Sequence, residues 1–122
     1  MINRVGWVQV FVSDMNRAVD FYENSLGIAV RNRSPEFPEF VELATEGTIL
    51  ALHSAGDDDR QLIGRNTGIT LTVSDVDAAY RSLSAKGVRF SQPPQRQPRG
   101  SAMTSFFDPD GNEISLLEFG EG

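Results

Sequence analysis

The sequence contains no cysteine and only one histidine, His53. The absence of cysteine excludes disulfide bonds, thiolate metal centres, iron–sulfur clusters and cysteine nucleophiles. A Gly-x-Ser-x-Gly motif is also missing, which argues against a serine nucleophile of the hydrolase type. Histidine is the side chain that titrates nearest neutral pH, so His53 is the one candidate for general acid–base catalysis. Most single strand histidines only make hydrogen bonds, and that alternative stays open.

Positive charge is also scarce. The chain has 11 Lys and Arg against 17 Asp and Glu, a net charge of −6. Nucleic acids and anionic membrane surfaces are therefore not expected partners. No apolar run approaches the roughly 18 residues that a transmembrane helix needs. Residues 1–4 lead into a strand rather than a signal peptide, which favours a cytoplasmic protein.

A length of 122 residues predicts one domain, residues 1–122. Nearly every residue from Val5 to Val12 is apolar, which predicts a strand buried on both faces. Ser13 and Asp14 offer N-cap oxygens for a helix whose apolar residues recur every three or four positions. Gly27 is expected to end that helix in the left-handed conformation.

Three more strands are expected at residues 28–33, 39–44 and 48–53, with a hairpin turn at 45–47. The following stretch, 54–66, has turn composition and consecutive aspartates, so it is interpreted as a solvated linker. The loop 35–38 contains two prolines and Phe37, and loops of this kind often determine ligand choice.

The pattern then repeats. Residues 8–14 (VQVFVSD) match residues 69–75 (ITLTVSD), and later segments match in the same order. The repeat predicts two βαβββ modules, 4–54 and 67–120, joined by the linker 55–66. Three prolines in 92–100 are expected to prevent strand pairing there. Asp108–Gly111 is interpreted as a structural turn, because a calcium site needs more oxygen ligands than this loop offers.

These motifs resemble the vicinal oxygen chelate superfamily, which includes glyoxalase I, bleomycin-resistance proteins and extradiol dioxygenases. The resemblance is carried by Val8–Asp14 with Ala18, Phe21, Tyr22, Leu26 and Gly27, by the second copy from Ile69, and by Asp108–Asn112. It implies an α+β fold of two tandem βαβββ modules, whose curled mixed sheets surround a cleft with the helices outside. It also implies a homodimer, as in many relatives.

Strand alternation assigns side chains to this cleft, because residues two apart point the same way. Val8, Val10 and Val12 are expected to face the helices, and Arg31 and Arg33 to share one face of their strand. The candidate ligand pocket consists of Trp7, Gln9, Phe11, Arg31, Phe40, Ala51, His53, Thr70, Glu113, Ser115 and Leu117. Trp7 offers either a stacking surface for a ligand ring or plain core packing.

The resemblance also implies four metal-ligand positions, which here carry Trp7, Ala51, Gly68 and Ser115. None is a usual ligand, since only the serine has a side-chain oxygen to offer. The sequence therefore predicts no metal and no other cofactor. Gln9, His53 and Glu113 each stand two residues from such a position, about 6–7 Å along a strand, and are not expected to converge on one ion.

The favoured function is metal-free binding of a small, partly aromatic metabolite or antibiotic, resembling the bleomycin-resistance branch. An enzyme stays open as the alternative: a glyoxalase-like lyase or isomerase, or a dioxygenase, with a non-standard metal site or His53 as acid–base group. A third possibility is an interaction module within a larger assembly. Fold resemblance alone does not decide between them, because one scaffold carries many chemistries.

Overall fold

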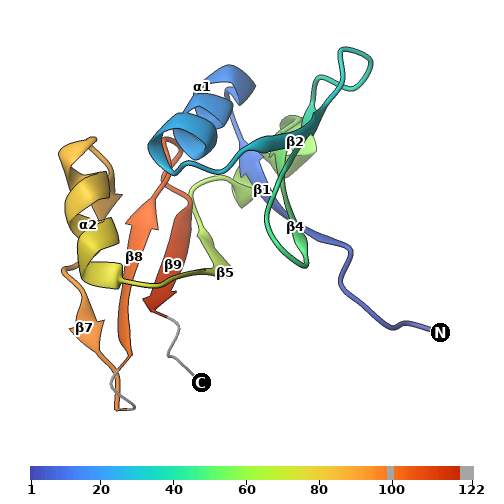
Figure 1. The fold of residues 1–122 in the computed structure, drawn as a ribbon. Coiled ribbons are helices and arrows are strands. Elements are labelled where there is room, and N and C mark those ends of the chain that lie inside the picture. Colours follow the sequence, from blue (N-terminus) through green and yellow to red (C-terminus); the bar gives the residue numbers. More distant parts are fainter. Residues whose placement is uncertain (99–100, 119–122) are drawn as a thin grey trace. The chain divides into compact units, whose positions relative to one another are not determined.

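The computed structural model describes residues 1–98 and 101–118 (Figure 1). The chain divides into two compact units, residues 1–63 and 64–122. Each unit contains one mixed sheet and one main helix in the order strand, helix, then further strands. This is the predicted α+β architecture of curled mixed sheets. In the described ranges, no helix has both the length and the apolar character that crossing a membrane requires.

The sheet of the first unit has the strand order β1-β4-β3-β2. Its strands are β1 (Trp7–Val12), β2 (Val30–Arg33), β3 (Phe40–Leu43) and β4 (Ile49–Ser54). β1 runs parallel to β4, whereas the β2–β3 and β3–β4 pairs are antiparallel. The first and last strands of the module therefore lie side by side, and their outward side chains share one face.

Burial alternates along β1, so the expectation that both of its faces are buried was wrong. Val10 and Val12 are at most 1% exposed, whereas Trp7 is 53% exposed and Gln9 is also exposed. The valines pack into the core with Leu50 of β4, as their predicted orientation requires. The other face carries large side chains that stay accessible to a ligand.

The predicted helix of the first unit consists of α1 (Met15–Asp20) and a π-helical turn, Phe21–Ser25. The carboxylate of Asp14 caps it by accepting a hydrogen bond from the Arg17 backbone N–H at 3.1 Å. Gly27 follows with φ of 79°, which confirms the predicted left-handed terminator. The expected linker is exposed for the most part, but it also forms a short 3₁₀ helix, Asp57–Leu62.

The second unit repeats this arrangement with the order β5-β9-β8-β6, and β7 also pairs with β8. The elements are β5 (Asn66–Val73), α2 (Val76–Ala85), β6 (Arg89–Phe90), β7 (Gln95–Arg96), β8 (Ala102–Phe107) and β9 (Glu113–Glu118). The Asp75 carboxylate caps α2 as Asp14 caps α1. Figure 1 shows α2 along one side of β8 and β9, against which it packs.

The proline-rich loop pairs with a strand, against expectation. β7 lies antiparallel to β8, with Gln95 opposite Met103 and Arg96 opposite Ala102. The prolines stand at positions 93, 94 and 98, on either side of this pair. Both paired residues therefore keep the backbone N–H that proline lacks.

The turn before β9 is structural, as its composition predicts. Asp108 Oδ1 accepts hydrogen bonds from the backbone N–H groups of Asp110 and Asn112, both at 2.9 Å. Asn112 Nδ2 donates to Asp108 Oδ2 at 2.8 Å, and Asn112 Oδ1 accepts from the Gly64 N–H. Gly111 provides the positive φ of 81° that closes the turn.

Candidate functional site

Four rings meet on the accessible face of the first unit's sheet, and we call them the aromatic row. Trp7 and Phe40 lie edge to face with ring centroids 6.1 Å apart, and Phe40 meets His53 edge to face at 5.7 Å. Phe11 stacks on His53 at 5.2 Å, with 25° between the ring planes. Such pairs each contribute about 0.5–1.5 kcal/mol beyond the area they bury, so the row holds its rings in place.

Strand register brings the row together. His53 of β4 stands directly opposite Phe11 of β1 on one side and Phe40 of β3 on the other. Side chains directly opposite one another across neighbouring strands lie about 4.5–5.5 Å apart at their Cβ atoms. The predicted alternation therefore places these residues correctly, and the parallel β1–β4 pairing makes them neighbours.

Gln9 contacts His53, with 2.8 Å between Gln9 Oε1 and His53 Nδ1. Because a carbonyl oxygen only accepts, Nδ1 is the donor in this contact. The expectation that these two side chains do not converge was wrong for the pair. Gln9 stands opposite Ala51, two positions from His53, and its long side chain spans that diagonal. The hydrogen bond and the stacked ring of Phe11 together fix the orientation of the imidazole.

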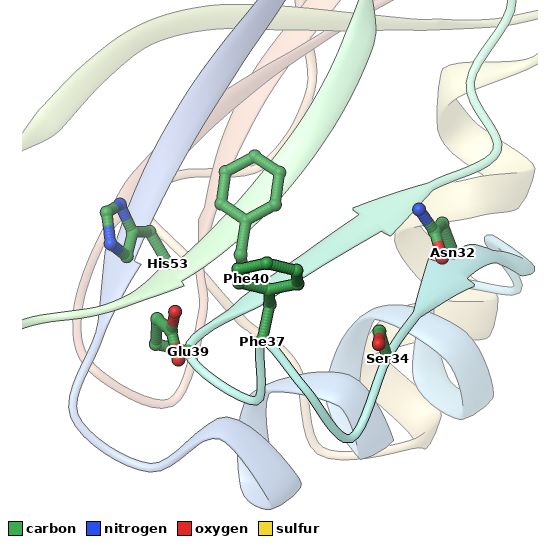
Figure 2. A pocket seen from close by; sticks show the side chains of 6 residues that line it. All are labelled: Asn32, Ser34, Phe37, Glu39, Phe40 and His53. Atoms are coloured by element: carbon green, nitrogen blue, oxygen red, sulfur yellow. The ribbon is translucent and has the colours of Figure 1, made fainter.

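A cavity of about 320 Å³ adjoins the row. Figure 2 shows its lining: the rings of Phe37 and Phe40 stand between His53 and Glu39 on one side and Asn32 and Ser34 on the other. Small-molecule sites are usually cavities of about 300–1,000 Å³ with apolar walls and a few polar groups, so this cavity lies at the small end of that range.

The loop between β2 and β3 presents Phe37 to the cavity. The Phe37 N–H donates to the Ser34 carbonyl at 3.1 Å, and the Phe40 N–H donates to the Phe37 carbonyl at 3.2 Å. Two consecutive turns therefore fix the backbone at Phe37, a residue that is 61% exposed. The proline-containing loop was expected to influence ligand choice, and it does supply part of the lining.

Sequence reasoning did not select Asn32, Ser34 and Glu39 as site residues. Ser34 and Glu39 lie in the loop between β2 and β3, where period-two alternation does not apply, and Asn32 follows the register shift in β2. The available signal was position alone, since Glu39 directly precedes Phe40. Its backbone carbonyl accepts a hydrogen bond from the Ser54 N–H at the end of β4, which fixes its place beside the row.

The two arginines of β2 do not share a face, contrary to expectation. The strand register shifts between Val30 and Asn32. Arg31 Nε lies 3.6 Å from Glu42 Oε1, whereas Arg33 Nη2 donates to Asn16 Oδ1 beside α1 at 2.6 Å. A β-bulge adds one residue to the strand and so reverses the alternation that the sequence predicts. Neither arginine lines the cavity.

Ala51 is also misassigned as a pocket residue. It is 0% exposed and belongs to the core of the described chain. A small side chain between longer neighbours on a crowded sheet face is easily covered by them. Position 51 therefore offers no surface to a ligand.

In the second unit, the remaining candidates lie on β5 and β9 and form a different kind of surface. Thr70 stands opposite Ser115, which in turn stands opposite Ser105. The hydroxyl oxygens of the two serines are 3.3 Å apart. Leu117 stands opposite Met103 and Glu113 opposite Phe107. This face is rich in hydroxyl groups.

The four positions that relatives use for a metal do not fit one here. Trp7 packs against Phe40, Ala51 is buried, and Gly68 has no side chain. The Ser115 hydroxyl, the one oxygen available, is engaged with Ser105. An indole N–H donates only, and transition metals need several imidazole or carboxylate ligands. Throughout residues 1–98 and 101–118, no three His, Asp or Glu side chains gather into a possible metal site.

Comparisons with known proteins agree with this fold. A model of the Glyoxalase/Bleomycin resistance protein/Dioxygenase superfamily matches residues 4–116. A superfamily member from Sphaerobacter thermophilus is 37% identical, with a TM-score of 0.82, and the match covers 95% of this chain and 97% of that one. TnmS3, an antibiotic binding protein from Streptomyces, is 31% identical with a TM-score of 0.79 and 94% of each chain covered. A lactoylglutathione lyase from Neisseria meningitidis is 27% identical over 88% of this chain and 84% of its own length.

Proposed function

Because the chain belongs to the glyoxalase/bleomycin resistance protein/dioxygenase superfamily, we propose that it binds a small, partly aromatic metabolite or antibiotic without a metal ion. One observation carries the proposal: the aromatic row stands beside a cavity of about 320 Å³ on an accessible sheet face. A planar ligand ring would stack on Phe37 or Phe40, and the groups around these rings would orient its polar substituents.

The antibiotic-binding relative supports this reading. TnmS3 has the same fold and is similar over nearly its whole length. A pocket that sequesters a molecule needs shape, apolar surface and a few polar anchors, and it needs no reactive group. The cavity beside the aromatic row offers these features, while the four positions that correspond to the family's metal ligands carry Trp7, Ala51, Gly68 and Ser115.

The experiment uses Trp7, the only tryptophan of the chain, as its reporter. Fluorescence is titrated with a panel of aromatic metabolites and antibiotics in the presence of a metal chelator. We expect saturable quenching or a spectral shift for at least one compound. Phe40→Ala should weaken that response, and Arg60→Ala, an exposed substitution in the 3₁₀ helix, is the matched control. If no compound of the panel produced a response, the interaction-module alternative would become the leading reading.

A second candidate function, acid–base catalysis by His53, rests on its contact with Gln9. That hydrogen bond engages Nδ1, so Nε2 is the ring nitrogen left for proton transfer, on a ring that stacks on Phe11. The similarity to a lactoylglutathione lyase makes that reaction the natural first assay. His53→Gln and His53→Ala should both abolish such an activity while the fold persists. Unchanged turnover in either variant would eliminate this candidate.

We also propose a homodimer, which the family resemblance implies, located in the cytoplasm, which the sequence favours. Light scattering of the purified protein measures the oligomeric state directly. A mass close to twice 13.4 kDa is expected, and a monomeric mass at all concentrations would contradict the dimer. Cell fractionation tests the location.

A further inference from the structure

The charge around the cavity is one-sided. Of the residues in 1–98 and 101–118, Glu39 is the only acidic one that lines the cavity, and no lysine or arginine lines it. Among the residues that the structure describes, the Glu39 carboxylate has no ion-pair partner. Figure 2 shows the carboxylate on the same side of the two phenylalanine rings as His53, which also lines the cavity.

The nearby cations are held elsewhere. Arg31 pairs with Glu42 at 3.6 Å, and Arg33 bonds to Asn16 on the helix side of the sheet. The other polar side chains of the lining are Asn32, Ser34 and His53, and the amide and the hydroxyl carry no charge. An anionic ligand would therefore meet the Glu39 carboxylate and find no lysine or arginine in the lining to pair with.

The two phenylalanine rings act in the same direction as the carboxylate. The face of an aromatic ring carries partial negative charge and attracts cations within about 6 Å of its centre. Phe37 and Phe40 both line the cavity, and Phe37 is 61% exposed, so its ring is accessible to a ligand. A carboxylate and two ring faces around one small cavity favour a positively charged group.

We infer that this cavity selects an organic cation, specifically an aromatic ring that carries a quaternary or protonated nitrogen. The inference rests on the proposed function and narrows it to one ligand class. The ring stacks on Phe37 or Phe40, and the charged nitrogen lies against the Glu39 carboxylate. The net charge of −6 attracts cations to the whole molecule, but only Glu39 places a negative charge in the lining.

The test compares three probes of similar size: 1-methylquinolinium chloride, its neutral isostere 1-methylnaphthalene, and the anion 2-naphthoate. Binding is followed through the ring resonances of His53, the only histidine, because this residue lines the cavity. We expect the cation to bind about three- to fivefold more tightly than the neutral isostere, and the anion more weakly than both. High salt should reduce the difference, since the carboxylate is exposed.

Two isosteric variants test whether the Glu39 carboxylate causes the preference for the cation. Glu39→Gln should weaken binding of 1-methylquinolinium and so reduce its advantage over 1-methylnaphthalene, while the neutral probe binds as before. Glu36→Gln makes the same change of net charge at an exposed residue of the same loop that does not line the cavity. It should leave the preference for the cation intact.

The outcomes separate this inference from the function on which it rests. If neutral and cationic probes bound the wild-type protein equally well near His53, the charge selection would be refuted and aromatic binding would stand. Equal losses in Glu39→Gln and Glu36→Gln would also refute it, because they would indicate a general effect of net charge. If none of the three probes perturbed His53, the inference would fail, and the panel titration would decide the proposed function separately.

Discussion

Apart from the additional strand β7, the two units have the same order of strands and main helix and the same strand pairings, yet their accessible faces differ in chemistry. In the first unit, Gln9, Phe11, Phe40 and His53 occupy the positions that register assigns to Thr70, Thr72, Met103 and Leu117 in the second. Rings and an imidazole in one copy correspond to hydroxyl and aliphatic groups in the other. The comparison indicates that the buried face preserves the fold, while the accessible face is free to specialise.

The turn before β9 in the second unit is held by more side-chain hydrogen bonds than the turn before β4 in the first unit. Disrupting it should therefore have the largest effect on stability. Asp108→Ala removes a carboxylate that is 2% exposed and accepts three hydrogen bonds. We expect a loss of about 3 kcal/mol in the free energy of unfolding, measured by urea denaturation. In the first unit, Thr45 accepts from the Leu50 N–H and donates to Thr48, and Thr45→Ala should cost only about 1 kcal/mol. Equal losses would contradict this difference between the turns.

The faces themselves are compared by truncating equivalent side chains. Phe40→Ala should weaken binding of an aromatic ligand about tenfold, because the ring lines the cavity and contacts both Trp7 and His53. Met103→Ala, at the equivalent position of the second unit, should change the affinity less than twofold. Calorimetric titration measures both. A larger loss for the methionine variant would place the ligand on the second face instead.

The contact between Gln9 and His53 predicts a smaller effect. Gln9→Leu keeps the side-chain size but removes the acceptor of Nδ1–H, so the imidazole is free to rotate. Ligand affinity should fall about threefold and the His53 ring resonances should broaden, whereas stability should change by less than about 1 kcal/mol. Unaltered resonances would mean that stacking on Phe11 alone orients the ring.

The smallest effect is expected at the ion pair of Arg31 with Glu42. The arginine side chain is 58% exposed, so solvent screens the pair. Arg31→Ala should lower the free energy of unfolding by less than about 0.5 kcal/mol and leave ligand affinity unchanged. A clear loss of affinity would show that Arg31 contacts the ligand, as the sequence alone suggests.

The fold could be predicted because the sequence carries local signals at the helix boundaries and repeats its motifs in the second unit. Asp14 and Asp75 cap the helices, and Gly27 ends the first one, so each boundary has its own cause in the sequence. The strand faces followed from alternation wherever the register was regular. Alternation failed in β2, where the shift near Arg31 depends on pairing with β3 and leaves no mark in the sequence.

The candidate site was predicted in part, for equally physical reasons. Trp7, Phe11, Phe40 and His53 lie on regular strands, so period two placed them on one face. Glu39 belongs to a loop whose path is set by turns and by a backbone contact with β4, and residue type alone does not reveal that contact. Strand spacing also underestimated the reach of long side chains, as the diagonal from Gln9 to His53 demonstrates.

The most direct test of the central claim is a titration of one aromatic ligand into chelator-treated protein and into protein supplied with zinc, nickel, manganese or ferrous ions. The His53 ring resonances report binding in the diamagnetic samples, and calorimetry reports it in all of them. The account predicts the same dissociation constant under every condition, with the ligand in contact with His53. Binding that appears only after a divalent ion is added would contradict it.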